Sequence, residues 1–269
     1  MKLWNELRKQ LLKHPGQTVW EGTAKMSYEE LLIYAETLAA QLRAERYCIL
    51  CRSESANAGA ILACLAAGKT AIPLPCGSGE AGYQDLLKHV DPPAIITDLW
   101  EELSVLRMEQ LRPLSVSKPA SAIFFLSDAP AADNALSLSD RDLLHEAKRI
   151  RRRFALTPGD RLLITRSLCR ASVFVHEFLP ALLSGCSVDF CPANLPGAAL
   201  LRLIRANRTT VLCAAPSALA SLDPFLYGTA DTVRALSLGD EPPTLRCAQI
   251  IRRTFPSAYI FSHAKDPGA

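Results

Sequence analysis

The sequence has no excess charge of either sign and no long apolar run. Its 269 residues carry 30 lysines and arginines against 27 aspartates and glutamates, a balance too even to indicate binding to nucleic acid or to an anionic membrane. The longest uncharged apolar stretch, Ala58 to Gly68, is too short to span a bilayer. The opening residues, MKLWNELRKQLLKH, mix both charges and predict an amphipathic helix, not a signal peptide. We therefore expect a soluble, cytoplasmic chain with neither nucleic acid nor a membrane as its partner.

The cysteines do not form the pattern of a disulfide framework or of a metal site. There are nine, an odd number scattered along the chain, as is typical of a reducing compartment. Cys48 and Cys51 form a single C-x-x-C without a second ligand pair at similar spacing. His176 lacks the second histidine of a zinc helix, so a packed or half-exposed helix residue is expected there. We predict buried cysteines and no metal.

Short apolar strands alternate with amphipathic helices along the chain. Ser27 opens a helix with a capping box, SYEE. Strands are predicted at YCILC, TAIPLP and PAIITD, with helices at Ala58 to Ala67 and at YQDLLKHV. After an irregular stretch near residues 100 to 120, the alternation resumes with SAIFFLS and DRDLLHEAKRIRRRF. Apolar residues at helical spacing are predicted to point inward: Leu31, Tyr34, Ala35, Leu38, Leu42, Leu143, Leu144, Ala147, Ile150 and Phe154.

This alternation predicts an α/β fold with two consecutive subdomains, residues 1–115 and 116–269, each with a mainly parallel sheet flanked by helices. The tripeptide GKT at Gly68 to Thr70 does not complete a Walker loop. Ala63 stands where that motif needs a glycine, and the tripeptide joins a helix to a strand instead of a strand to a helix. Gly68 is therefore predicted to be a helix C-cap.

Five segments occur in an order that resembles a known family. They are SYEELLIYAETLAAQL, ILCRSESANAGAILACLAAGKTAIPLP, LTPGDRLLITRSLCRASVFVHEFLPALLSGCSV, TVLCAAPSALASL and VRALSLGDEP. In this order they are similar to segments of the adenylate-forming superfamily, which includes acyl-CoA synthetases, luciferases and the adenylation domains of nonribosomal peptide synthetases. The resemblance implies the fold of the large N-terminal domain of these enzymes, truncated, with the lid domain absent.

The family's phosphate loop, Y-T-S-G-T-T-G-K-P-K-G-V, aligns with FLSDAPAADNAL, residues 125–136. Only Ser127 matches, and the glycine and lysine positions are all replaced: Asp128, Ala131, Ala132, Asn134 and Ala135. Glycines let backbone amides approach phosphate oxygens, and Pro130 removes one amide donor. Asp128 and Asp133, which can also be simple turn formers, would each repel a phosphate charge ~6 Å away by roughly 3 kcal/mol. We expect weak or absent binding of ATP and magnesium, and hence no cofactor.

Other positions of the former acyl and nucleotide cleft also depart from the family. Arg170 stands where acyl-CoA synthetases carry a histidine; it can capture an anion or be a surface or ion-paired arginine. The family's GGE aligns with Gly239, Asp240 and Glu241. Its YGxTE aligns with HAKDP, which places His263 and Asp266 at the tyrosine and threonine positions. No catalytic residue is predicted.

The sequence therefore predicts a degenerate homologue without ATP-dependent ligase activity, which acts as a binding or scaffolding module. Its partner, another protein or a second copy, is expected at the C-terminal surface, formed by the last strand and the helices LLRLIRAN and LRCAQIIRRTF. Arginines would rim this contact and favour an acidic partner: Arg202, Arg205, Arg208, Arg246, Arg252 and Arg253. Two alternatives stay open: a ligase subunit whose lid domain comes from another chain, and a small-molecule carboxylate binder that uses the old acyl cleft near Arg170 and Gly239.

Overall fold

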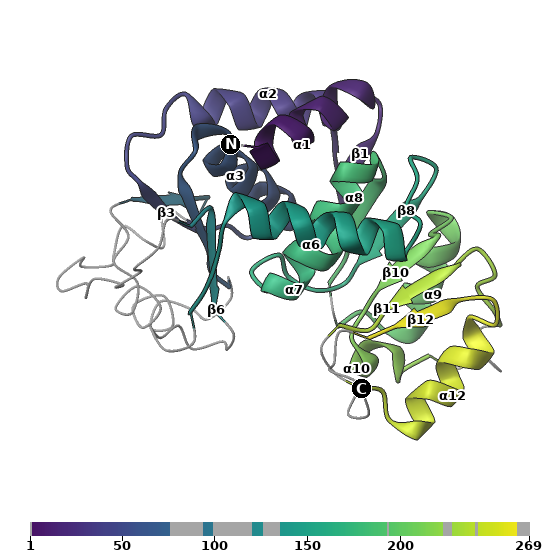
Figure 1. The fold of residues 1–269 in the computed structure, drawn as a ribbon. Helices are drawn as coiled ribbons and strands as arrows, with labels where there is room; N and C mark the ends of the chain where they lie inside the picture. The colour runs from purple at the N-terminus through teal and green to yellow at the C-terminus, as the bar shows by residue number, and fades with distance from the viewer. Residues whose placement is uncertain are drawn as a thin grey trace.

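The computed structural model describes residues 2–75, 94–98, 120–125, 135–192, 194–222, 228–239 and 242–262. It contains two sheets with helices packed on them (Figure 1). The larger sheet has seven strands in the order β12 (Tyr259–Phe261), β11 (Ala235–Ser237), β10 (Val211–Cys213), β8 (Arg161–Ile164), β9 (Ser187–Phe190), β1 (Thr18–Glu21) and β2 (Ala24–Ser27). Its pairings are parallel except between β1 and β2.

The smaller sheet has five strands in the order β5 (Ile95–Thr97), β3 (Arg46–Leu50), β4 (Thr70–Pro73), β6 (Ala122–Phe125) and β7 (Ala135–Leu138). Only the β6–β7 pairing is antiparallel. The predicted α/β class with mainly parallel sheets is therefore confirmed.

The sheets exchange strands between the two halves of the chain. The hairpin of β1 and β2, which the sequence analysis does not predict, joins the sheet of the second half through β9. Strands β6 and β7 from the second half join the sheet of the first half through β4. The predicted boundary between residues 115 and 116 lies outside the described residues and stays a prediction.

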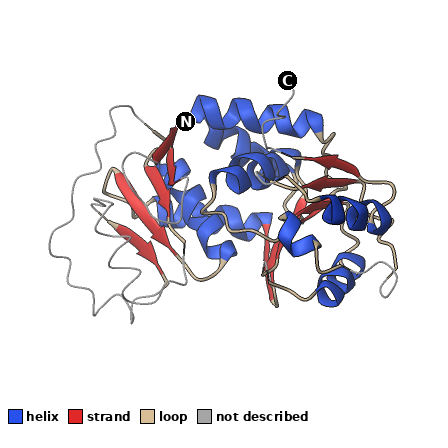
Figure 2. Ribbon diagram, turned by 90° about the horizontal axis from the view of Figure 1, so that it is seen from below, coloured by secondary structure: helices blue, strands red, loops and turns tan. Residues whose placement is uncertain are grey.

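Helices fill the space between the two groups of strands and cover the outer face of the larger sheet (Figure 2). They are α1 (Lys2–Lys13), α2 (Tyr28–Ala39), α3 (Glu54–Ala67), α6 (Asp140–Arg153), α7 (Ala171–Val173), the π-helical turn η2 (Phe174–Phe178), α8 (Leu179–Ser184), α9 (Gly197–Ala206), α10 (Pro216–Leu219) and α12 (Leu245–Thr254). The predicted helix YQDLLKHV lies outside the described residues. In the described part of the chain, no helix is long and apolar enough to cross a membrane.

Local sequence determines several helix ends. Ser27 accepts a hydrogen bond from the Glu30 amide and Glu30 reaches back to the Ser27 amide, which confirms the predicted capping box. Ser139 forms a second capping box at the start of α6. Gly68 ends α3 with a φ of +68°, as its predicted C-cap role requires.

One apolar core joins the two sheets. Buried side chains of α1, α2, α3, α6 and α8 belong to a single cluster, and α1 packs on α2, α6 and α8. A second cluster lies under α9 and α12. The inward prediction is wrong for Tyr34, which is 40% exposed although its ring packs against Gly59 of the neighbouring helix. Leu38 and Leu144 are only partly buried.

Most of the described cysteines are buried. Cys48 and Cys51 both lie in the core, as predicted. Burial raises the pKa of the Cys64 thiol to about 12, so this thiol stays protonated and unreactive at neutral pH. Among the described residues, no group of three or more side chains has the composition of a metal site.

Candidate functional site

The larger sheet has a topological switch point between β8 and β10. Strand β9 follows β8 in the chain and pairs on one side of it, whereas β10 comes next and pairs on the other side. Open parallel sheets bind ligands in the crevice outside the carboxyl ends of their strands at such a point. The carboxyl ends of β8, β10 and β11 are therefore the first place to look for functional side chains.

A buried ion pair stands at this switch point. Arg166 follows β8 by two residues, and its Nη2 donates to Oε1 of Glu177 in η2. The hydroxyl of Ser237, the last residue of β11, donates to the same carboxylate oxygen over 2.8 Å. The Arg166 side chain is 11% exposed and that of Glu177 is fully buried. Three elements from distant parts of the chain thus converge on one carboxylate.

The π-helical turn brings Glu177 into the core. The turn lies between α7 and α8, and π-helical turns often occur at functional sites. Its buried residues are Phe174, Val175, Glu177 and Phe178, so a charged side chain is held inside an aromatic segment. His176 is half-buried, as predicted.

Gly239 lets the arginine lie against the backbone. Its φ is +72°, a conformation that favours glycine, and a Cβ placed on it would overlap Nη1 of Arg166. The guanidinium group therefore fills the space directly beside this backbone segment. The sequence resemblance aligns this glycine with the family's GGE motif; in the structure it contacts a side chain of its own chain.

Some polar atoms beside the ion pair make no hydrogen bond. Arg166 Nε and Thr165 Oγ1 are both buried and have no partner within the described part of the chain. Buried polar atoms normally have a partner. The carboxyl end of β8 therefore keeps one unused donor and one hydroxyl that can donate or accept.

The structure places only some of the predicted site residues. Arg170 is exposed at the N-cap of α7, and Gly239 contacts Arg166. Ala135 begins β7 in the other sheet, opposite Phe125. The remaining predicted positions lie outside the described residues: Ser127, Asp128, Ala131, Ala132, Asn134, Asp240, Glu241, His263 and Asp266.

The sequence analysis misses Arg166, Glu177 and Ser237. A signal was present, because Arg166 lies two residues beyond a buried strand and Glu177 interrupts the apolar run FVHEF. The sequence does not indicate that these two residues pair, because Arg166 lies in a loop and Glu177 in a helical turn, and only the fold brings them together.

A second polar cluster lies at the opposite, amino end of the same sheet. Asp160 accepts hydrogen bonds from Arg234 at 2.7 and 2.8 Å, from the Thr157 amide at 2.8 Å and from the Thr210 hydroxyl at 2.7 Å. Burial alone would raise the pKa of the Asp160 carboxyl, but these hydrogen bonds outweigh it and hold the pKa below its usual range. This cluster joins three loops and has a structural role.

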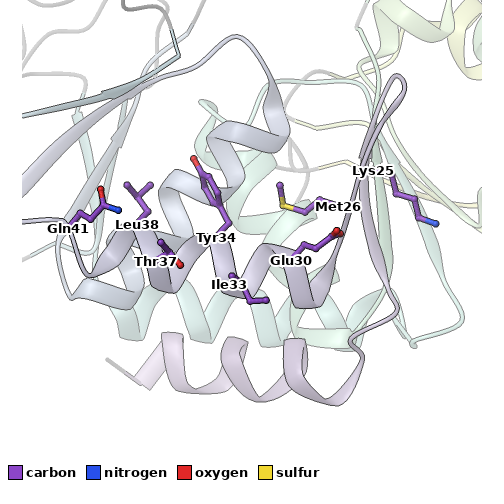
Figure 3. A pocket seen from close by; sticks show the side chains of 8 residues that line it. All are labelled: Lys25, Met26, Glu30, Ile33, Tyr34, Thr37, Leu38 and Gln41. Atoms are coloured by element: carbon purple, nitrogen blue, oxygen red, sulfur yellow. The ribbon is translucent and has the colours of Figure 1, made fainter.

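A surface groove of about 570 Å³ runs along α2 (Figure 3). The lining side chains come from β2 and α2: Lys25, Met26, Glu30, Ile33, Tyr34, Thr37, Leu38 and Gln41. The apolar residues occupy its centre, and it is remote from the larger sheet's C-terminal strands in Figure 1. The groove offers packing surface, and its Glu30 is engaged in the capping box of α2.

No protein-family model matches the sequence, and no curated protein does. Solved structures do match. VinN in complex with L-aspartate superposes with a TM-score of 0.76 at 16% identity, over 96% of this chain and 74% of VinN. The Vibrio cholerae adenylation domain AlmE in complex with glycyl-adenosine-5'-phosphate gives 0.78 at 16% identity, over 98% of this chain and 59% of AlmE.

A fatty acyl-adenylate ligase, from a study of the E. coli and L. pneumophila enzymes, gives 0.75 at 20% identity, over 97% of this chain and 57% of the ligase. This chain therefore spans about three quarters of VinN and less than two thirds of the other two. At such low identity the comparison establishes the arrangement of helices and strands, which agrees with the resemblance found in the sequence. The chain has the α/β fold of the adenylate-forming superfamily.

Proposed function

We propose that this chain keeps the adenylate-forming fold without the ligase chemistry and acts as a binding or scaffolding module. The first support is the segment from Ser127 to Ala135, where no glycine or lysine remains at the positions that the family uses to hold phosphate. An acidic residue, Asp128, stands at one of the former glycine positions. The segment thus offers a polyphosphate no lysine charge, and Asp128 and Asp133 add an unfavourable one.

The observation that carries the proposal is the ion pair at the switch point. Arg166 and Glu177 neutralise each other where an open parallel sheet normally receives a ligand. Arg166 also fills the space beside Gly239. A ligand bound there would have to separate two buried charges, and that separation is costly.

Calorimetry with ATP and magnesium tests the proposal. We expect weak or absent binding, and no carboxylate-dependent exchange of pyrophosphate into ATP. Micromolar affinity, which corresponds to about 8 kcal/mol, would contradict it. The exchange assay repeated in an extract of the source cell tests the alternative of a ligase completed by another chain, because activity would then appear only in the extract.

A small-carboxylate binder is the second candidate. The unused Arg166 Nε favours it, since this buried donor can bind one carboxylate oxygen. Calorimetry with a panel of short carboxylic acids tests this function. The control is Arg166→Met, which removes the donor and should abolish any heat of binding that depends on it.

The proposed protein contact lies at the C-terminal surface. Strand β12 is the edge of the larger sheet, and it exposes Tyr259 and Ile260, while Leu245 at the start of α12 is 87% exposed. Edge strands and exposed apolar side chains favour association. Light scattering at several concentrations distinguishes a second copy from another protein. A strictly monomeric chain that captures no partner from the source cell would contradict this contact.

A further inference from the structure

The amino edge of the larger sheet gathers nine arginines. Helices that connect parallel strands run back against them, so the ends of α9 and α12 lie beside the starts of β10 and β12, and the end of α6 lies beside the start of β8. We call this surface the arginine edge and define it by nine residues: Arg151, Arg152, Arg153, Arg161, Arg205, Arg208, Arg234, Arg252 and Arg253.

Four of these arginines make structural contacts: Arg205 donates to the Thr229 carbonyl oxygen, Arg153 lies over the Phe261 ring, and Arg234 and Arg161 hold helix ends. Arg234 forms a bidentate pair with Asp160 and donates to the carbonyl oxygens of Phe154 and Ala155, which end α6. Arg161 donates to the carbonyl oxygen of Asn207 at the end of α9. Basic groups at helix C-termini are favourable because they balance the helix dipole. These arginines therefore already bind carbonyl oxygens at the C-terminal ends of α6 and α9.

Four further arginines have no such role. Arg151, Arg152, Arg208 and Arg252 are exposed, and their guanidinium groups have no acidic partner or hydrogen bond in the parts of the chain that the structure describes. The surrounding segments, residues 147–162, 201–211, 228–239 and 245–261, contain only two acidic residues, Asp160 and Asp231, and the adjacent β9 adds Asp189, which accepts a hydrogen bond from Asn207. The field at this edge is therefore strongly positive, although the whole chain carries only +3.

Arg208 stands at a position that disfavours an arginine. It directly follows the C-cap of α9 and has a φ of +50°. Glycine or asparagine is the usual residue in this left-handed conformation, because a Cβ is strained there. The arginine at position 208 therefore does not stabilise the end of α9. It adds another exposed positive charge to this surface.

The arginine edge continues into the apolar edge strand. The Tyr259 amide donates to the Arg234 carbonyl oxygen, and Tyr259 and Ile260 are 55% and 37% exposed. Arginine and tyrosine together with an aliphatic side chain are typical of protein interfaces. A single exposed tyrosine does not provide the series of stacking platforms that single-stranded nucleic acid needs.

We propose that the arginine edge binds an acidic segment of a partner protein, whose apolar side chains pack on Tyr259 and Ile260. The inference rests on the proposed binding role and names the chemistry of the partner. Acidic side chains would neutralise Arg151, Arg152 and Arg208 without displacing an existing ion pair. Such complementarity increases the rate of association and its dependence on salt.

Fluorescence anisotropy with a labelled peptide of about twelve residues, alternating glutamate with leucine and tyrosine, tests this inference. We expect binding tighter than about 100 µM, weakened between about 50 and 300 mM salt, and lost when glutamine replaces glutamate. The pairs Arg151→Gln with Arg152→Gln and Arg208→Asn with Arg252→Gln should each weaken binding about three- to tenfold. Circular dichroism melting confirms that each variant is folded.

The matched control is Lys9→Gln with Lys13→Gln, which removes two exposed positive charges from α1. It should change the affinity by less than about twofold. An equal loss in this control would overturn the inference, as would no detectable peptide binding. Tighter binding of an oligothymidylate of equal charge would overturn it in favour of nucleic acid. Binding of ATP would contradict the proposed function and leave the peptide result unaffected, so the two failures are distinguishable.

Discussion

Replacing Arg166 by methionine tests the ion pair that closes the switch point. The Glu177 side chain is fully buried and the Arg166 side chain is 11% exposed, so solvent screens this pair little. Breaking a buried pair from one side costs about 3–5 kcal/mol because a charge stays without a partner. The hydrogen bond from Ser237 to the carboxylate remains, which favours the lower end, about 3 kcal/mol.

A double-mutant cycle separates the pair from other effects of the substitution. Glu177→Gln keeps a hydrogen-bond acceptor for Ser237 but leaves the Arg166 charge without its partner, so it should also cost about 3 kcal/mol. The double variant with Arg166→Met holds no charge at the site. Its loss of unfolding free energy should therefore be smaller than the sum of the two single losses by about 2 kcal/mol. Urea unfolding at neutral pH measures all four proteins. Two results would refute the closed ion pair: a loss of unfolding free energy below about 1 kcal/mol for Arg166→Met, or a double variant whose loss equals the sum of the two single losses.

Three other perturbations follow from the described contacts. Ser27→Ala removes the capping box of α2 and should cost about 1 kcal/mol in urea unfolding; an unchanged midpoint would contradict the cap. The lowered pKa of Asp160 implies stabilisation that is complete above about pH 3.9 and lost as the pH falls through the lower folded pKa. Unfolding from neutral pH to pH 2 should therefore show Asp160→Asn less stable at neutral pH and equal to the wild type in acid, whereas the exposed control Asp231→Asn should show no such convergence. In Gly197→Ala the new Cβ would overlap the Ser221 carbonyl oxygen, so thermal melting should reveal a loss of about 1–3 kcal/mol; full stability would mean that the backbone yields there.

The local sequence determines the described helices and strands well. Apolar periodicity identifies α6 and the buried strands, and the Ser27 and Gly68 signals fix one end each of α2 and α3. These signals act over three or four residues, the range of a capping box or a helical turn. The five segments between Ser27 and Pro242, taken in their order, also suffice for the family resemblance, which the superposed structures confirm at the level of the fold.

The sequence alone does not determine which sheet a strand joins. The hairpin of β1 and β2 pairs with β9, more than 150 residues away in the chain, and β6 pairs with β4 of the first half. The residues of a strand predict only that one of its faces is apolar and will be buried, and either sheet can bury such a face. That choice is made by contacts between elements far apart in the chain, which only the tertiary structure contains.

The same distinction explains the candidate site. The sequence by itself determined what the chain lacks, the glycines and lysines of a phosphate loop from Asp128 to Ala135, because that argument needs only residue types in order. Only the fold decided that Arg166 and Glu177 meet beside Gly239 at the switch point. A buried charge is stable only with its partner in contact, and that partner lies on another element, where no local pattern identifies it.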